Sequence, residues 1–157
     1  AIIGIDVNPA RESLARRFGA THFINPQPQS GDFVEQLRAL TDGGVDYSFE
    51  CVGSTKLMVH ALECTHPGWG VCTTLGVPPD GEKLPILPFE LQLGRTLKGS
   101  FLGNVKTRSQ LPGLLDLYAE GQINLDDLVT HRLPVERINE GFDLLREGRS
   151  VRTVVTF

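Results

Sequence analysis

Residues 45–76, VDYSFECVGSTKLMVHALECTHPGWGVCTTLG, contain two apolar runs with a helical segment between them. The first run, VDYSFE, ends at a turn. STKLMVHALE then follows with apolar residues at helical spacing, before the second run, WGVCTTLG, begins. A strand, a helix of about ten residues and another strand form the usual pattern of two parallel strands joined by a crossover helix. This stretch therefore predicts an α/β fold with a parallel sheet.

The same alternation is present toward the amino end of the chain. It predicts strands over residues 2–5 and 21–25 and helices over residues 9–18 and 30–40. Asn8 is the expected cap of the first helix and Ser30 the start of the second. Because residues 2–5 are apolar at nearly every position, we expect this strand to be buried on both faces.

Beyond Gly76 the alternation gives way to other patterns. Residues 77–85 are rich in Pro, Gly and Asp and predict a loop, and residues 84–103 read as extended segments interrupted by Pro88 and Gly94. The remaining predicted elements are helices at 111–121 and 136–148 and strands at 128–134 and 151–157. We place the domain boundary near Phe101, which gives parts 1–101 and 102–157.

The composition excludes several classes of partner. The chain has 157 residues, 40% apolar content and a net charge of −4, with no basic cluster that would favour nucleic acid. No apolar stretch approaches the roughly 18 residues that a membrane span needs. We therefore expect a cytoplasmic globular protein with no nucleic-acid or membrane partner.

The chain has three cysteines, Cys51, Cys64 and Cys72, and their spacing shows no pairs. An odd number without pairs favours reduced thiols that are buried as small apolar side chains. Cys64, His66 and Cys72 could suggest a metal site. We favour burial, because structural zinc usually has two close pairs of ligands and these three residues do not provide them.

Asp6 is the strongest candidate for chemistry. In doubly wound nucleotide-binding sheets an acid at the end of the second strand accepts hydrogen bonds from the ribose and disfavours a 2'-phosphate, so NAD is preferred over NADP. The alternative is that Asp6 accepts hydrogen bonds from the turn before the helix. Val52 and Gly53 follow another strand, at the sheet edge where such folds bind ligands, and Arg152 could pair with a pyrophosphate or form a surface salt bridge.

Several long strings together resemble the carboxyl-terminal portion of the zinc-containing, medium-chain alcohol dehydrogenases. They are IIGIDVNP, FGATHFINP, TDGGVDYSFECVGS, ALECTHPGWG, LGVPPDG, GRTLKGSFLGN and THRLPVERINEGFDLLREGRSVRTVVTF. The resemblance covers essentially the whole chain. It implies an incomplete doubly wound (Rossmann) parallel sheet that lacks its first strand, followed by the carboxyl-terminal part of the catalytic domain. The zinc ligands and the glycine-rich turn would precede residue 1, so no catalytic or metal-binding residue is expected within this chain.

The resemblance also assigns residues to the NAD site. Asp6 matches the ribose-binding acid, Arg11 an adenosine contact, and Arg152 the partner of the pyrophosphate. Val7, Val52 and Gly53 match the adenine pocket, and the main chain of Leu75, Ser100 and Leu102 matches the positions that hold the carboxamide. Val77 and Phe101 would line the substrate pocket, and Phe89 and Gln92 would approach it from a second subunit, in a homodimer formed through residues 84–93.

The reaction that the resemblance implies is hydride transfer between NAD and a small alcohol or aldehyde, with zinc polarising the oxygen. Three alternatives stay open: an S-(hydroxymethyl)glutathione dehydrogenase of the same family, a noncatalytic nucleotide-binding relative, and a methyltransferase. Pro67 stands where glutathione-dependent members typically carry a lysine, which favours an ordinary alcohol dehydrogenase. The order of the downstream segments fits a methyltransferase less well than it fits a dehydrogenase of this family.

Overall fold

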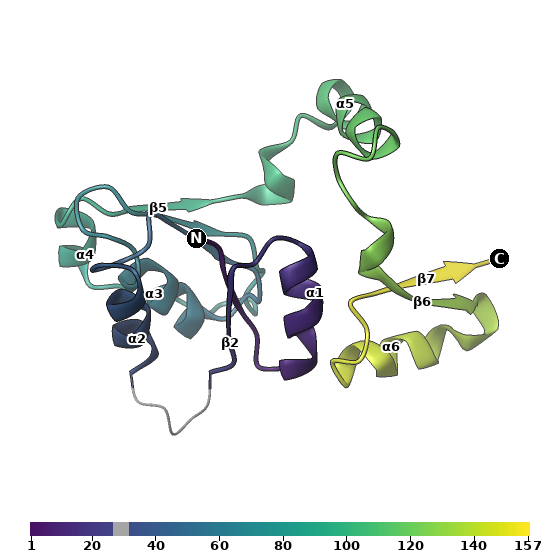
Figure 1. The fold of residues 1–157 in the computed structure, drawn as a ribbon, viewed down its shortest axis with the longest axis horizontal. Coiled ribbons are helices and arrows are strands. Elements are labelled where there is room, and N and C mark those ends of the chain that lie inside the picture. Colours follow the sequence, from purple (N-terminus) through teal and green to yellow (C-terminus); the bar gives the residue numbers. More distant parts are fainter. Residues whose placement is uncertain (27–31) are drawn as a thin grey trace. The chain divides into compact units, whose positions relative to one another are not determined.

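The computed structural model describes residues 1–26 and 32–157, so the predicted helix start at Ser30 lies outside the described residues. The chain divides into two compact units, Ala1–Asn104 and Val105–Phe157. Figure 1 shows the elements of each unit in sequence colours. Among the described residues, no helix is both long and apolar enough to span a membrane.

The first unit alternates short strands with helices. Its strands are β1 (Ile3–Ile5), β2 (His22–Ile24), β3 (Tyr47–Glu50), β4 (Val71–Thr74) and β5 (Thr96–Gly99). Its helices are η1 (Pro9–Arg11), α1 (Glu12–Arg17), α2 (Phe33–Leu40), α3 (Thr55–Glu63), α4 (Pro88–Gln92) and η2 (Phe101–Asn104), of which η1 and η2 are 3-10 helices.

All strand pairs of this unit are parallel. β1 pairs with β2, whereas β3, β4 and β5 form a separate sheet in that order. In a doubly wound dinucleotide-binding sheet, the first strand lies between the second and the fourth. β1 and β2 therefore match the second and third strands, and β3 to β5 match the fourth to sixth. No strand of the described residues occupies the first position, and the predicted fold class is confirmed.

Side-chain caps fix where the helices start. The Asn8 side chain accepts the Ala10 N–H at 3.0 Å, as predicted, and Ser54 Oγ accepts the Leu57 N–H at 3.4 Å at the start of α3. Asp32 caps α2 by accepting the Val34 N–H at 2.9 Å. The helices then bury their apolar faces against the strands, with Val34 and Leu37 of α2 in one core cluster.

Two predictions for the first unit are wrong. Residues 84–103 are not extended throughout, because Pro88 occupies the first turn of the helix α4, where its missing N–H costs no hydrogen bond. Residues 2–5 are not buried on both faces: Ile2 is 59% exposed and Ile5 45% exposed. The second edge of β1 has no neighbouring strand among the described residues, and this leaves the side chains of β1 open.

The second unit has its own small sheet. It contains α5 (Thr107–Ala119), η3 (Asp126–Leu128), β6 (Val129–Pro134), η4 (Val135–Arg137), α6 (Ile138–Arg146) and β7 (Arg152–Thr156). β6 and β7 are parallel, and α6 buries Leu144 in this unit. α5 begins four residues before the predicted start at residue 111 and contains Pro112 within its first two turns.

Candidate functional site at the carboxyl edge of the sheet

Glu50, the last residue of β3, holds two loops together at the carboxyl edge of the sheet. Its Oε1 accepts the N–H groups of Val52, Gly53 and Ser54 at 2.9, 2.8 and 3.3 Å. Its main-chain oxygen accepts the N–H groups of Leu75 and Gly76 at 2.8 and 3.0 Å. Glu50 is only 4% exposed, so these bonds form away from competing water.

The same two loops approach each other so closely that only glycine fits. Gly53 has a φ of +89°, and a Cβ there would lie 2.4 Å from the Val77 carbonyl oxygen. A Cβ at Gly76 would lie 1.9 Å from the Gly53 nitrogen. The 52–54 turn and the 75–77 loop are therefore packed backbone to backbone.

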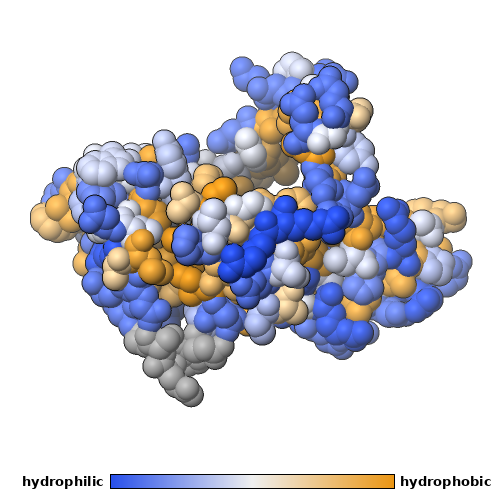
Figure 2. Space-filling view, in the orientation of Figure 1, coloured by the Kyte–Doolittle hydropathy of each residue, from blue (hydrophilic) through white to orange (hydrophobic). Residues whose placement is uncertain are grey.

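This packing brings four of the predicted site residues together: Val52, Gly53, Leu75 and Val77. Ser100 joins them, since its N–H donates to the Thr74 carbonyl at 3.0 Å directly beside Leu75. Apolar side chains are unusually exposed here, 74% for Val52 and 86% for Val77. Figure 2 shows apolar surface, in orange, on the left-hand part of the picture, which is the first unit. Exposed apolar side chains beside closely packed loops suit a flat organic ligand.

The turn after β5 has an unusual backbone. Leu102 and Asn104 adopt left-handed φ values of +47° and +56°, on either side of Gly103 at +70°. Such conformations are unfavourable for residues with a Cβ, and strained backbone of this kind clusters at active sites and ligand-binding regions. Phe101 and Leu102 are both largely exposed in this turn.

Asp6 lies at the carboxyl end of β1. Its Oδ1 accepts the Asn8 N–H at 2.7 Å, and its own N–H donates to the Ile24 carbonyl at 3.2 Å. The turn-acceptor role considered for Asp6 is therefore present. It does not exclude a ribose contact, since a carboxylate has more than one acceptor position. Val7 is largely exposed and Arg11 half-buried in the adjoining segment.

Two of the predicted residues lie elsewhere in the first unit, and a third belongs to the second unit. Phe89 and Gln92 belong to α4, which precedes β5. Leu93, directly after α4, accepts the N–H of Gly68 at 2.7 Å, and Gly68 itself precedes β4. Both predicted residues are therefore at the amino edge of this sheet, away from Leu75 and Ser100. Arg152 is exposed at the start of β7 in the second unit.

The cysteines do not share one environment. Cys64 and Cys72 are buried, as expected of small apolar side chains, but Cys51 is exposed because it lies in the turn that follows β3. Burial raises the pKa of the Cys64 thiol to about 11. No group of three or more His, Cys, Asp or Glu side chains suited to a metal ion occurs in residues 1–26 and 32–157.

Glu50 is the site residue that the sequence analysis missed. Its position, an acid that ends a strand just before a glycine-containing turn, could have identified it. Its Oε2 is buried and has no hydrogen-bond partner among the described residues. A buried acceptor without a partner is costly and is uncommon in folded proteins.

A parallel sheet with crossover helices, and with a glycine-rich cluster of loops at its carboxyl edge, defines a doubly wound fold of the Rossmann type. Within that class the chain belongs to the zinc-binding dehydrogenase family, whose model matches residues 1–120. The family resemblance found in the sequence is thus confirmed.

Individual relatives agree with this assignment. The chain is 47% identical to an alcohol dehydrogenase class-3 from Dictyostelium discoideum, over 98% of the chain and 41% of the relative. It is 43% identical to an S-(hydroxymethyl)glutathione dehydrogenase from Paracoccus denitrificans, over 99% of the chain and 43% of the relative. The crystal structure of benzyl alcohol dehydrogenase from Acinetobacter calcoaceticus is similar with a TM-score of 0.88 and 28% identity, over 98% of this chain and 42% of that one. The chain therefore spans less than half the length of these relatives.

Proposed function

We propose that this chain provides the coenzyme-binding part of a zinc-dependent, NAD-linked alcohol dehydrogenase that acts on a small alcohol or aldehyde. The observation that carries the proposal is the loop cluster that Glu50 holds at the carboxyl edge, in a chain of the zinc-binding dehydrogenase family. The names of its relatives support the reaction.

The residues present fit NAD. Exposed Val7 and Val52 can flank an adenine ring with Gly53, while Asp6 and Arg11 can contact the adenosine. Main-chain groups of Leu75, Ser100 and Leu102 can orient the carboxamide, because backbone N–H and C=O groups bind whatever the side chain is. We assign Arg152 to the pyrophosphate, for which the forked guanidinium is well suited.

Hydride exchange with the alcohol carbon is the chemistry that NAD supplies when bound, and zinc would polarise the oxygen. We propose that the metal is held by residues other than those described in this chain. Val77 and Phe101, both more than four-fifths exposed, would line the substrate pocket. Phe89 and Gln92 would reach it from a second subunit. On this proposal the 157-residue chain alone positions coenzyme without turning over substrate.

A second candidate is oxidation of S-(hydroxymethyl)glutathione, because relatives carrying that name match almost the whole chain. Pro67 argues against it, since its ring offers neither a charge nor an N–H to a glutathione carboxylate. The alternative that the chain is a noncatalytic nucleotide-binding relative stays open. Its cytoplasmic location and the absence of nucleic-acid and membrane partners stay predictions.

Calorimetric titration of the chain with NAD and NADP tests the coenzyme proposal. We expect NAD to bind more tightly, and we expect Asp6→Asn to reduce the difference about tenfold or more, because the variant removes the charge that repels a 2'-phosphate. An amide oxygen can still accept the Asn8 N–H, so the turn should persist in this variant.

Asp116→Asn, an acid exposed on α5, is the matched control and should leave both affinities unchanged. Equal affinity of the parent chain for NAD and NADP would contradict the role of Asp6. Absence of any NAD binding would contradict the proposed function as a whole.

A further inference from the structure

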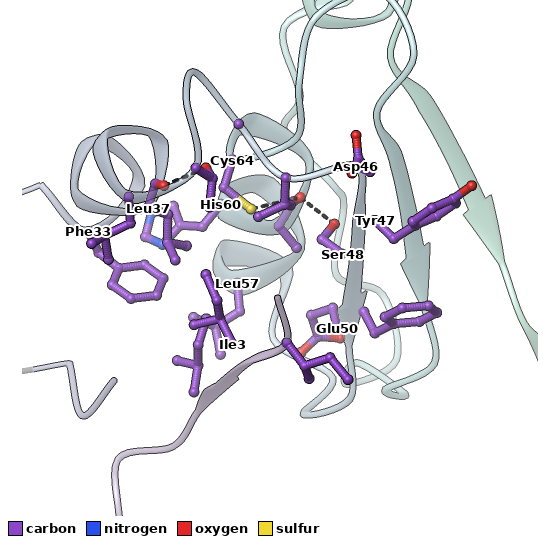
Figure 3. A pocket seen from close by; sticks show the side chains of 18 of the residues that line it. Ile3, Phe33, Leu37, Asp46, Tyr47, Ser48, Glu50, Leu57, His60 and Cys64 are labelled. Atoms are coloured by element: carbon purple, nitrogen blue, oxygen red, sulfur yellow. Dashed lines mark hydrogen bonds between the residues drawn. The ribbon is translucent and has the colours of Figure 1, made fainter. Parts of the chain in front are cut away.

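The four histidines of the chain lie in different surroundings. His60 lines a pocket of the first unit (Figure 3), and His66 Nδ1 lies 2.6 Å from the Pro67 carbonyl oxygen. In His22 and His131, by contrast, Nδ1 faces the hydroxyl of the preceding threonine, at 2.9 and 3.0 Å. Histidine is the side chain whose charge ordinarily changes between about pH 5 and 8, so its contact with a hydroxyl can make a hydrogen-bond network depend on pH.

Thr130 stands at an irregularity in the pairing of β6 with β7 (Figure 1). The paired positions advance by two residues on β6, from Val129 to His131, but by only one on β7. Thr130 is therefore an extra residue, as in a β-bulge, a feature that is rare in parallel pairs and common next to active sites. Its Oγ1 stands in for the missing ladder bonds, because it accepts the Val151 N–H at 3.1 Å and lies 3.3 Å from the Arg152 carbonyl oxygen.

The Thr130 hydroxyl has more neighbours than it can serve at once. A hydroxyl has one hydrogen to donate and two lone pairs that accept. The Val151 N–H uses one lone pair, and the carbonyl oxygen of Arg152 can only accept. Nδ1 of His131 accepts or donates, depending on whether it carries a hydrogen. The state of His131 therefore decides whether the Thr130 hydrogen is available to Arg152.

The two protonation states of His131 give opposite bond directions. In the neutral ring with its hydrogen on Nε2, Nδ1 accepts the Thr130 hydrogen, and the Arg152 carbonyl loses it. In the charged ring, the proton taken up from water sits on Nδ1 and is donated to Thr130, whose own hydrogen then turns to the Arg152 carbonyl. Ser150 Oγ lies 3.2 Å from Thr130 Oγ1 and 2.8 Å from Thr153 Oγ1, so it can donate toward either hydroxyl as the direction changes.

The charges around His131 leave this hydroxyl contact as its main polar link. Besides Arg132 on β6 itself, the charged side chains on the elements that pack against β6 are Arg152 on β7, Glu136 and Arg137 on η4, and Glu140, Asp143 and Arg146 on α6. Arg137 pairs with Glu140, and Arg146 pairs with Asp143. Within residues 1–26 and 32–157, none of these carboxylates forms an ion pair with His131.

We propose that His131 is a positioning residue for Arg152. Its protonation, relayed by the Thr130 hydroxyl, fixes the Arg152 backbone at the start of β7 and so strengthens the hold of the Arg152 guanidinium on an anionic ligand. We assign that ligand to the coenzyme pyrophosphate, and for its identity the inference rests on the proposed function. The contribution of the relay is present when His131 is charged, so coenzyme affinity should fall as the pH rises from about 6 to about 8.

NMR of the 157-residue chain, labelled with ¹³C and ¹⁵N, tests the relay without coenzyme. At pH values near about 8 we expect the His131 ring to carry its hydrogen on Nε2, and the Arg152 carbonyl resonance to move with the same pH midpoint as the ring. Thr130→Val keeps the shape of the side chain but removes the hydroxyl, so the Arg152 carbonyl should stop following His131. Thr130→Ser restores the hydroxyl and should restore the response. Thr130 is exposed, and circular dichroism verifies that both variants are folded.

Calorimetric titration with NAD between about pH 6 and pH 8 tests the effect on the ligand. We expect the affinity of the parent to fall about threefold or more over this range, because one hydrogen bond to the Arg152 backbone is lost. Thr130→Val should show no such fall. His22→Gln is the matched control, since it removes the corresponding contact with Thr21 in the first unit and should keep the pH dependence of the parent.

Several outcomes would overturn the proposal. One is a hydrogen on Nδ1 of the neutral His131 ring, and another is an Arg152 carbonyl that does not respond to His131. An equal pH dependence in Thr130→Val would show that the charge acts without the relay. NAD binding by the parent that does not vary with pH would refute the positioning role and leave the proposed function intact. A chain that binds no NAD at all would instead contradict the proposed function, and with it the ligand named here.

Discussion

At the scale of single residues, the three thiols should differ in reactivity. Burial, followed by the neighbouring Glu50 carboxyl, raises the pKa of the exposed Cys51, and burial raises the pKa of Cys64 to about 11 and also that of Cys72. Because the thiolate is the reactive form, we expect iodoacetamide to modify Cys51 first, slowly near about pH 8 and faster at higher pH. Peptide mass spectrometry measures the order. Equal rates for all three thiols in the folded chain would contradict it.

The raised pKa of Cys64 has a consequence for stability. The unfolded thiol ionises near its ordinary pKa of 9.0, whereas the folded thiol stays protonated until about 11. The stabilisation linked to this group is therefore fully present below pH 9.0 and is lost as the pH rises toward about 11.

Arg95 is the other residue whose burial permits a prediction. Its Nη1 lies 2.5 Å from Glu90 Oε2, its Nε donates to the Thr65 carbonyl at 2.9 Å, and its side chain is 2% exposed. Arg95→Met leaves the Glu90 carboxyl without its partner, so we expect a loss of about 3 kcal/mol in the free energy of unfolding. Urea denaturation followed by Trp69 fluorescence measures it.

Arg16→Met is the control for that measurement, because Arg16 pairs with Glu12 on the surface of the same unit. Exposed pairs contribute about 1 kcal/mol or less. Equal losses in the two variants would show that the Arg95 pair gains nothing from burial.

At the scale of elements, the contact between the 52–54 turn and the 75–77 loop should not tolerate a methyl group. In Gly76→Ala the new Cβ would lie 1.9 Å from the Gly53 nitrogen and 2.7 Å from Glu50 Oε2, so the loops must separate. We expect a lower melting temperature and weaker NAD binding. Gly113→Ala, in α5 with no atom near its Cβ, should be neutral or stabilising by up to about 1 kcal/mol. A melting temperature for Gly76→Ala equal to that of the parent would refute the close contact.

The elements also show what the sequence could reveal. The strands β3 and β4 and the helix α3 follow from apolar runs and spacing, and the caps Asn8 and Ser54 follow from residue type. The helix α4 could not be predicted in this way, because a proline in the first turn of a short helix looks the same in sequence as a proline that breaks a strand. Glu50 was missed for a related reason: its bonds to two loops depend on strands that pair across residues 50–76. The roles assigned to Asp6 and Arg152 stay predictions.

At the scale of the whole molecule, the predicted homodimer gains support from residues 84–93. Leu87 and Phe89, at the start of α4, are 64% and 60% exposed, and Leu91 and Leu93 are also exposed. Several large apolar side chains in one short segment usually mark an interface. This segment lies at the amino edge of β5.

We therefore expect the chain to dimerise and Phe89→Asp to raise the dimer dissociation constant about tenfold or more, because a charge would be buried against apolar side chains. Sedimentation equilibrium over a range of concentrations measures this constant. Phe142→Asp, at a similarly exposed phenylalanine of α6, is the matched control and should dimerise as the parent does. A parent chain that stays monomeric, or a dimer that both variants weaken equally, would rule out residues 84–93 as the interface.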